Sequence, residues 1–208
     1  MSLYGVLLCT ALYFLLGYDR VLIHLEINKV VGNRLIDAFF YYITYLGDGT
    51  VAVFILILLL IFNVRLGLYA TSSFLTASLF SIALKHLFFD DENRPMFIFS
   101  YIDKQPVKLV EGVEMFIHNS FPSGHATQAF SVFMCLVFVS KNHSYKYFFF
   151  ALALFTALSR VYLSQHWLAD VTAGSAIGMF FSILYYFLFI KKNSLEKLNK
   201  PIFAFKTH

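Results

Sequence analysis

The chain has 208 residues, of which 59% are hydrophobic, 19% aromatic and 13% charged, and its formal net charge is +4. This hydrophobic share exceeds the roughly 45–50% of ordinary globular domains. Residues 51–62 form an apolar run without a single charge. These features exclude a soluble domain and predict a polytopic membrane protein. The small charge, with no basic stripe clear of the apolar runs, argues against a nucleic-acid partner.

Six apolar runs follow one another along the chain, at residues 2–18, 50–64, 68–89, 125–140, 147–164 and 169–190. Each is near the roughly 17–25 residues that a crossing helix needs. Helices are expected because unpaired backbone groups of isolated strands are too costly in lipid. The first run lacks a basic n-region and an A-x-A-like cleavage site, so we expect an uncleaved span. The length indicates one domain over residues 1–208. The apolar runs predict that this domain is all-α, with six transmembrane helices.

Two segments are predicted to lie outside the membrane core. Residues 19–49 mix charges with aromatic residues, which predicts an amphipathic helix on the membrane surface that ends at the Gly47-Asp48-Gly49 turn. Residues 90–121 form one long extramembrane loop that carries six acidic residues. Loops of this length are often functional lids.

Six spans place both termini on the same side of the membrane. That side collects eight cations, and the other side collects five once Lys85, Arg94 and Arg160 are set aside as motif residues. This bias predicts cytoplasmic termini. The motif residues then share the outer face, and a compact chain of this kind is compatible with a bacterial inner membrane and a periplasmic site.

The first group of candidate site residues lies around the fifth and sixth runs. His166 and Asp170 are four residues apart, so they share a face if helical. A carboxylate beside an imidazole fixes its tautomer, and such a histidine can attack phosphorus directly. Arg160 lies six residues before His166, and its planar fork suits bidentate contact with phosphate. The alternative is a polar interfacial bend with one salt bridge.

The second group lies where the loop meets its flanking helices. Pro122-Ser123-Gly124-His125 has the composition of a helix start, where free N–H groups bind anions. Gly124 allows close approach of a ligand to the backbone, and His125 is placed to donate a proton. Arg94-Pro95 and Lys85 add positive charge. The alternatives are ordinary capping for Ser123 and snorkelling to lipid headgroups for Lys85.

Together these segments resemble the signature of the type 2 phosphatidic acid phosphatase superfamily, which is K-x6-R-P, then P-S-G-H, then S-R-x5-H-x3-D. Residues 122–125 and 159–170 match in full, whereas Lys85 and Arg94 enclose eight residues rather than six. The resemblance implies that His166 is the nucleophile, Asp170 orients it, and His125 is the general acid and then the base. It also implies that the phosphoryl group is held by a further set, which is Lys85, Arg94, Ser123, Gly124 and Arg160.

No metal or other cofactor is expected, because no histidine–cysteine cluster has metal-ligand spacing and no nucleotide-binding loop occurs. Cys9 and Cys135 are expected to be buried thiols rather than a disulfide. Gln165 and Trp167 flank His166 and are candidates for shaping the pocket. The remaining histidines are expected at the surface or the membrane interface, and they are His24, His86, His118, His143 and His208.

The sequence therefore favours a membrane phosphatase that hydrolyses a lipid phosphate or pyrophosphate through a phosphohistidine. A phosphotransferase on the same scaffold is one alternative, and a non-enzymatic anion or lipid transporter is another. The paired histidines with Asp170 argue against a transporter, since anion binding needs only the cations. Undecaprenyl pyrophosphate, phosphatidic acid, phosphatidylglycerol phosphate and lipid A phosphates all remain candidate partners in the bilayer, and the sequence sets no oligomeric state.

Overall fold

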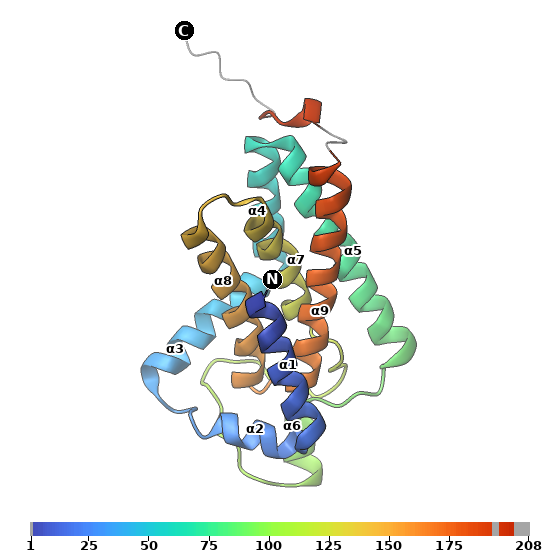
Figure 1. Cartoon of the computed structure of the whole chain (residues 1–208). Helices are drawn as coiled ribbons and strands as arrows, with labels where there is room; N and C mark the ends of the chain where they lie inside the picture. Colours follow the sequence, from blue (N-terminus) through green and yellow to red (C-terminus); the bar gives the residue numbers. More distant parts are fainter. Residues whose placement is uncertain (1, 193–195, 202–208) are drawn as a thin grey trace.

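The structure is a computed structural model that describes residues 2–192 and 196–201. Within this part the chain is all-α, as predicted (Figure 1). The longer helices are α1 (Ser2–Gly17), α2 (Arg20–Asn28), α3 (Arg34–Ile43), α4 (Gly49–Phe62), α5 (Val64–Phe88), α7 (Gly124–Val139), α8 (His143–Tyr162) and α9 (Leu168–Tyr185). The short ones are η1 (Thr44–Gly47), α6 (Pro95–Phe97), the π-helix η2 (Ile98–Ile102), the π-helix η3 (Tyr186–Lys191) and η4 (Glu196–Leu198).

Helix α7 forms the centre of the bundle and packs against α5, α8 and α9. Two glycines of α9 permit its close approach to α7. A Cβ added at Gly174 would lie 2.5 Å from the carbonyl oxygen of Ser123, and one at Gly178 would lie 2.6 Å from that of Thr127. Small residues at helix crossings let backbones meet in this way. The first turns of α7 and α9 are thereby held together, and Ser123 N donates to Asp170 O at 3.0 Å.

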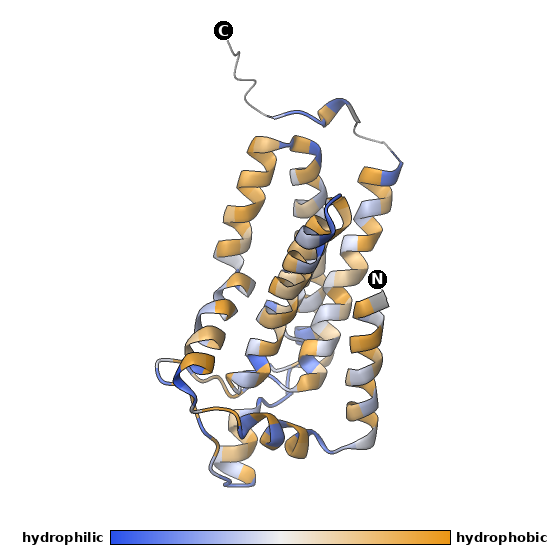
Figure 2. Cartoon of the chain, turned by 60° about the vertical axis from the view of Figure 1, so that its left-hand side comes forward, coloured by the Kyte–Doolittle hydropathy of each residue, from blue (hydrophilic) through white to orange (hydrophobic). Residues whose placement is uncertain are grey.

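The six apolar runs correspond to α1, α4, α5, α7, α8 and α9 followed by η3. Within residues 2–192 and 196–201, two helical runs could each cross a membrane by length and composition, Val64–Phe88 and Leu168–Lys191. The number rises to four if each of two bent helix pairs is one span, and α7 is a shorter apolar helix. Figure 2 shows apolar residues along the bundle, with hydrophilic ones gathered towards its ends. The arrangement of six spans stays a prediction.

The prediction of one amphipathic helix over residues 19–49 is wrong. The segment is α2 and α3, separated by a turn in which Gly32 has φ +103°, followed by η1. Helix α2 packs against α8 and α9, and α3 packs against α8, because each has its own apolar face to bury. The predicted end of the segment is confirmed, since Asp48 Oδ1 accepts from Thr50 N at 2.8 Å and caps α4.

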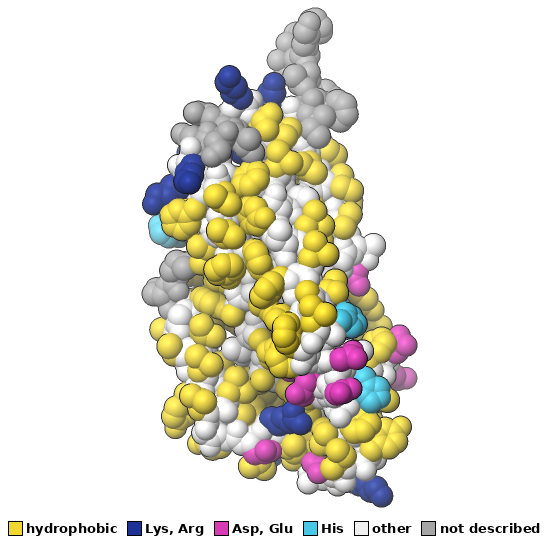
Figure 3. All heavy atoms as spheres, turned by 90° about the vertical axis from the view of Figure 1, so that its right-hand side faces the viewer, with side chains coloured by type: hydrophobic (Ala, Val, Ile, Leu, Met, Phe, Trp, Pro, Cys, Tyr) yellow, Lys and Arg dark blue, Asp and Glu magenta, His cyan; other side chains and the backbone are white. Residues whose placement is uncertain are grey.

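The loop at residues 90–121 folds back so that its two ends pair. Arg94 N donates to Ile117 O at 2.9 Å, and Ser120 N donates to Glu92 O at 2.9 Å. These backbone bonds bring Arg94 beside residues 118–120 at the end of the bundle where α5 ends and α7 begins. Figure 3 shows acidic side chains gathered at this end together with some histidine and basic side chains, while further basic side chains gather at the opposite end.

Candidate active site

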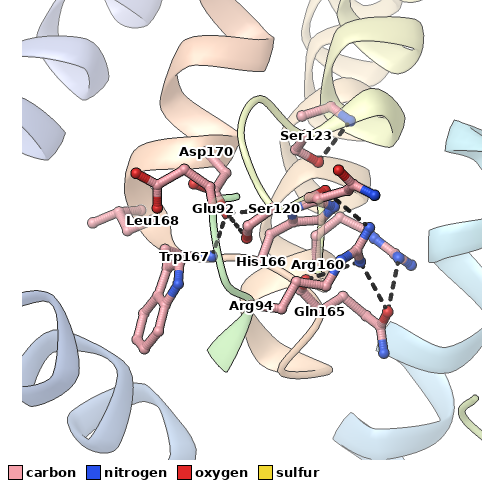
Figure 4. Close-up of polar contacts among 12 residues, drawn as sticks. Glu92, Arg94, Ser120, Ser123, Arg160, Gln165, His166, Trp167, Leu168 and Asp170 are labelled. Carbon is pink, nitrogen blue, oxygen red and sulfur yellow. Dashed lines mark hydrogen bonds and ion pairs between the residues drawn. The ribbon is translucent and has the colours of Figure 1, made fainter. Parts of the chain in front are cut away.

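The centre of the site is the pair formed by His166, in the turn between α8 and α9, and Asp170, in the first turn of α9. His166 Nδ1 lies 3.2 Å from Asp170 Oδ2, so the predicted contact is present (Figure 4). The same oxygen accepts from Trp167 N at 2.9 Å and from Ser120 Oγ at 2.5 Å. His166 and Asp170 are 2% and 3% exposed. Their orientation is therefore fixed by buried hydrogen bonds, since each is costly to leave unmade.

Two guanidinium groups lie beside this pair, and both contact Gln165. The Gln165 Oε1 atom accepts from NH1 of Arg94 and from NH2 of Arg160, each at 3.4 Å (Figure 4). Arg160 is anchored further by NH1 on Thr44 Oγ1 at 2.8 Å. Arg94 is anchored by Nε on His118 O at 2.8 Å and by NH1 on Gln165 O at 3.1 Å. Residues far apart in the sequence thus fix the positions of both guanidinium groups.

The Nε donor of Arg160 lacks an acceptor in the described part of the protein. This Nε is buried, and Arg160 as a whole is only 7% exposed. A buried donor left unpaired costs about 1–3 kcal/mol, and more when the group is charged. A bound anion whose oxygen reached this N–H would satisfy it.

Lys85 joins the same group of cations. Its Nζ donates to Asn119 O, and Arg94 NH2 donates to the same oxygen at 3.4 Å. The eight-residue interval is accommodated because α5 ends at Phe88, three residues after Lys85, and residues 89–94 continue outside a helix. Lys85 and Arg94 therefore meet at the carbonyl oxygen of Asn119 despite the longer interval.

The first turn of α7 completes the site. Ser123 Oγ accepts from Ala126 N at 3.5 Å, which confirms the predicted cap. A Cβ added at Gly124 would meet nothing within 4 Å, so the backbone faces open space there. His125 is close enough to His166, Arg94 and Arg160 for their charges to interact. All eight predicted site residues thus lie at one end of the bundle, around the His166–Asp170 pair.

Burial lowers the pKa of the His166 imidazole well below its ordinary value of 6.5, and the charges of Arg94, Arg160 and Lys85 act in the same direction. Each of these effects disfavours a second positive charge on the ring. His166 is therefore neutral at neutral pH. A neutral imidazole carries the free nitrogen lone pair that nucleophilic attack requires.

Some expectations for residues outside the motifs are confirmed and others are wrong. His86, His118 and His143 are exposed as predicted, and His208 lies outside the described residues. His24 was expected at a surface, but it is 2% exposed, because α2 folds onto the turn after α8 and His24 Nε2 lies 3.1 Å from Ser164 Oγ. Cys135 is buried as expected, whereas Cys9 is exposed on α1.

Sequence reasoning missed several residues that hold the site in place. Thr44, Asn119 and Ser120 contact Arg160, Lys85 and Asp170, respectively. No local pattern marks them, because their partners are 116, 34 and 50 residues away. Gln165 and Trp167 were suggested only as neighbours of His166. Within the described residues, no group of three or more His, Cys, Asp or Glu side chains could hold a metal ion.

Comparison with known proteins identifies the class that this fold and site represent. The family model described as the PAP2 superfamily matches residues 66–194, which is more than half of the chain. The chain belongs to the PAP2 superfamily, as the motif resemblance implied. It is an integral membrane protein with transmembrane helices, like the membrane phosphatases of bacteria in this family.

Two solved structures share the fold. One is the crystal structure of Aquifex aeolicus LpxE, with TM-score 0.67 and 28% identity, covering 78% of this chain and 92% of that one. The other is a transmembrane PAP2 type phosphatidylglycerolphosphate phosphatase from Bacillus subtilis, with TM-score 0.65 and 20% identity, covering 93% and 98%. At that lower identity the second similarity shows the fold alone.

Curated relatives are similar over shorter stretches. A lipid A 1-phosphatase of Porphyromonas gingivalis is 35% identical over 72 residues, which is 34% of this chain and 16% of that protein. A lipid A 1-phosphatase of Rhizobium johnstonii is 35% identical over 80 residues, which is 38% of this chain and 32% of that protein. The match thus spans about a sixth to a third of the length of these relatives.

Proposed function

We propose that the chain is a membrane phosphatase that removes phosphate from a lipid phosphate or lipid pyrophosphate through a phosphohistidine on His166. The observation that carries this proposal is the grouping of Lys85, Arg94 and Arg160 around a buried, neutral His166, with one Arg160 donor left for a ligand. Fixed cations aimed at the phosphoryl oxygens supply the main stabilisation that phosphoryl transfer requires.

In the first step the His166 nitrogen that does not face Asp170 attacks phosphorus, and the bond from phosphorus to the leaving oxygen breaks. His125 gives its proton to that oxygen. In the second step water attacks the phosphorus of the phosphohistidine, the bond from phosphorus to the His166 nitrogen breaks, His125 takes a proton of the water, and inorganic phosphate leaves. Asp170 holds the imidazole through Nδ1 and stabilises the positive charge that develops on the ring. The N–H group of Gly124, in the first turn of α7, supplies a further donor to the phosphoryl oxygens, whereas the N–H of Ser123 is already bonded to Asp170 O.

A lipid A phosphate is the first substrate to test, because the curated relatives carry the name lipid A 1-phosphatase. Phosphatidylglycerol phosphate comes next, because the Bacillus subtilis protein carries that name. Purified protein should release phosphate from at least one lipid of a panel that adds phosphatidic acid and undecaprenyl pyrophosphate. Activity should survive exhaustive EDTA treatment, because fixed cations neutralise the phosphate. Absence of release from the whole panel would overturn the proposal.

The proposal also covers the number of membrane crossings and the side of the membrane on which the site lies. The 208 residues would form one domain in which α1, α4, α5, α7, α8 and α9 cross the membrane, with the site on the outer face of a bacterial inner membrane. The site residues come from the last turn of α5, the loop after it, the start of α7, the last turn of α8, the turn that follows and the first turn of α9, all at one end of the bundle.

This topology can be tested by labelling engineered cysteines in a variant that lacks Cys9 and Cys135. Ser100 lies exposed at the end that holds the site, and Ser144 lies exposed at the start of α8. A membrane-impermeant maleimide added outside intact cells should label Ser100→Cys and leave Ser144→Cys unlabelled until the membrane is opened. The opposite pattern would place the site on the inner face.

A further inference from the structure

Gln165 makes side-chain contacts in two directions. It lies in the turn between α8 and α9 and is 1% exposed. Its Oε1 lies between the guanidinium groups of Arg94 and Arg160, and its Nε2 donates to Glu114 O at 3.0 Å and contacts Met115 Sδ at 3.3 Å. Every polar atom of this buried carboxamide therefore has a partner.

The contact of Gln165 with the two arginines offsets the repulsion between their positive charges. Two guanidinium groups held in one buried site repel each other, and side chains of this length have many rotamers to lose. One shared acceptor oxygen attracts both forks and fixes the distance between them. An amide oxygen does so without a full negative charge, so the positive charge meant for a phosphate is kept.

The two arginines depend on this oxygen to different degrees. Arg94 also donates to the backbone oxygens of His118 and Gln165. Arg160 has Thr44 as its other acceptor, and its Nε has none within the described residues. Loss of the carboxamide oxygen should therefore displace the guanidinium group of Arg160 more than that of Arg94.

The amino end of the carboxamide decides which way the oxygen points. Its bonds to Glu114 and Met115 come from the extramembrane loop, far from Gln165 in sequence. Because Nε2 must face these acceptors, Oε1 must face the guanidinium groups. The loop segment at residues 114–115 thereby holds the acceptor in place.

Building on the proposed phosphatase function, we propose that Gln165 is a positioning residue that sets the spacing of Arg94 and Arg160 for a tetrahedral phosphoryl group. The residue does not touch the reacting atoms. It acts through the two forks, chiefly that of Arg160, and it couples their position to the loop at residues 114–115.

The test compares Gln165→Met, which keeps the side-chain length and removes the polar atoms, with Gln105→Met as the control. Gln105 is exposed in the loop at residues 90–121, which also carries Glu114 and Met115. Inorganic phosphate binding is measured by calorimetry, and kcat and KM are measured on the best lipid of the panel. We expect Gln165→Met to weaken phosphate binding about tenfold and to lower kcat/KM about 10–100-fold, which corresponds to about 1.4–2.7 kcal/mol. Gln105→Met should match the wild type in both.

The double variant Arg160→Lys/Gln165→Met separates positioning from general damage. If Gln165 acts through Arg160, the second change should cost little once Arg160 has been replaced, so the losses in kcat/KM should not add. A residue that only supports the fold would instead lower the melting temperature and give additive losses.

A second variant covers the case in which Gln165→Met does not fold. Gln165→Glu retains the size and the oxygen acceptor, and its extra negative charge competes with the ligand. It should also weaken phosphate binding about tenfold. Wild-type phosphate affinity and kcat/KM in folded Gln165→Met, or wild-type phosphate affinity in folded Gln165→Glu, would overturn this inference alone. A wild-type protein that neither binds phosphate nor hydrolyses any lipid of the panel would overturn the proposed function and this inference with it.

Discussion

Ser120 Oγ donates to Oδ2 of Asp170, the same oxygen that lies 3.2 Å from His166 Nδ1. Ser120 has no exposed surface and lies near the end of the loop at residues 90–121. The backbone bond from Ser120 N to Glu92 O fixes its position. The orientation of the proposed nucleophile is therefore linked to the fold of the loop through a single carboxylate oxygen.

This link predicts the effect of Ser120→Ala. A hydrogen bond to a charged group contributes about 1.5–3 kcal/mol, so loss of this one should lower kcat by about 10–100-fold if the effect reaches the transition state. KM should change little, because Ser120 acts on Asp170 and not on the lipid. Steady-state kinetics on the best lipid of the panel checks this, with Ser100→Ala, an exposed serine of the same loop, as the control. An unchanged kcat in Ser120→Ala would show that Trp167 N alone holds Asp170.

His166→Ala should abolish turnover while the protein still folds. Loss of a nucleophile should cost at least about 10³-fold, or about 4 kcal/mol of activation free energy. Phosphate release measures the loss, and the melting temperature reports on folding. His86→Ala is the matched control, because His86 is exposed on α5 outside the site. More than a tenth of the wild-type rate in folded His166→Ala would rule out His166 as the nucleophile.

Lys85 and Arg94 should differ in how much the site depends on them. Arg94→Lys retains the charge but loses the fork that binds three backbone oxygens, so kcat/KM should fall at least about 100-fold. Lys85→Ala removes one of three cations and should cost about tenfold. Lys141→Ala, at the far end of α7, is the control. Wild-type kinetics in Lys85→Ala beside an inactive Arg94→Lys would mean that the site depends on two arginines only.

Gly124→Ala should leave stability unchanged and reduce activity. A Cβ there meets nothing within 4 Å, so the fold has room for it, but the methyl group would stand where a phosphate approaches the start of α7. We expect the melting temperature of the wild type and a loss of about tenfold in kcat/KM.

Gly178→Ala is the contrasting variant, because its Cβ would lie 2.6 Å from Thr127 O. Overpacking of this kind costs about 1–3 kcal/mol of stability. Full activity in Gly124→Ala would show that the phosphoryl group does not approach that backbone.

His166 should remain neutral in the folded protein at pH values where a free histidine is protonated. Its pKa is lowered by burial and by Arg94, Arg160 and Lys85, whereas the unfolded chain takes up the proton near 6.5. The unfolded state then binds more protons below that pH, so the free energy of unfolding should fall as the pH falls below about 6.5.

NMR titration of histidine-labelled protein measures the pKa of His166. Denaturant unfolding at several pH values measures how the free energy of unfolding changes with pH. The stability of His166→Ala should fall less than that of the wild type between about pH 7 and 5, because the variant lacks the imidazole that takes up a proton on unfolding. Titration of His166 at or above its ordinary pKa would contradict the expected environment.

Much of the site was visible in the sequence because its chemistry is encoded locally. The spacing of His166 and Asp170 predicted their contact, and the composition at Ser123 predicted the cap of α7. The apolar runs predicted α1, α4, α5, α7, α8 and α9, because an unbroken run of this length has few alternatives in lipid. These features depend on periodicity and on neighbouring residues, which a single sequence displays.

Other features depend on contacts between distant segments, and only the tertiary structure decided them. The segment at residues 19–49 divides into α2 and α3 because α8 and α9 offer surfaces on which to pack, and this packing buries His24. Ser120 reaches Asp170 and Gln165 reaches Arg94 because the loop closes on itself and lies against the turn after α8. A hydrogen bond between residues 50 or 71 positions apart leaves no periodic trace, since its free energy is gained only after the chain has folded.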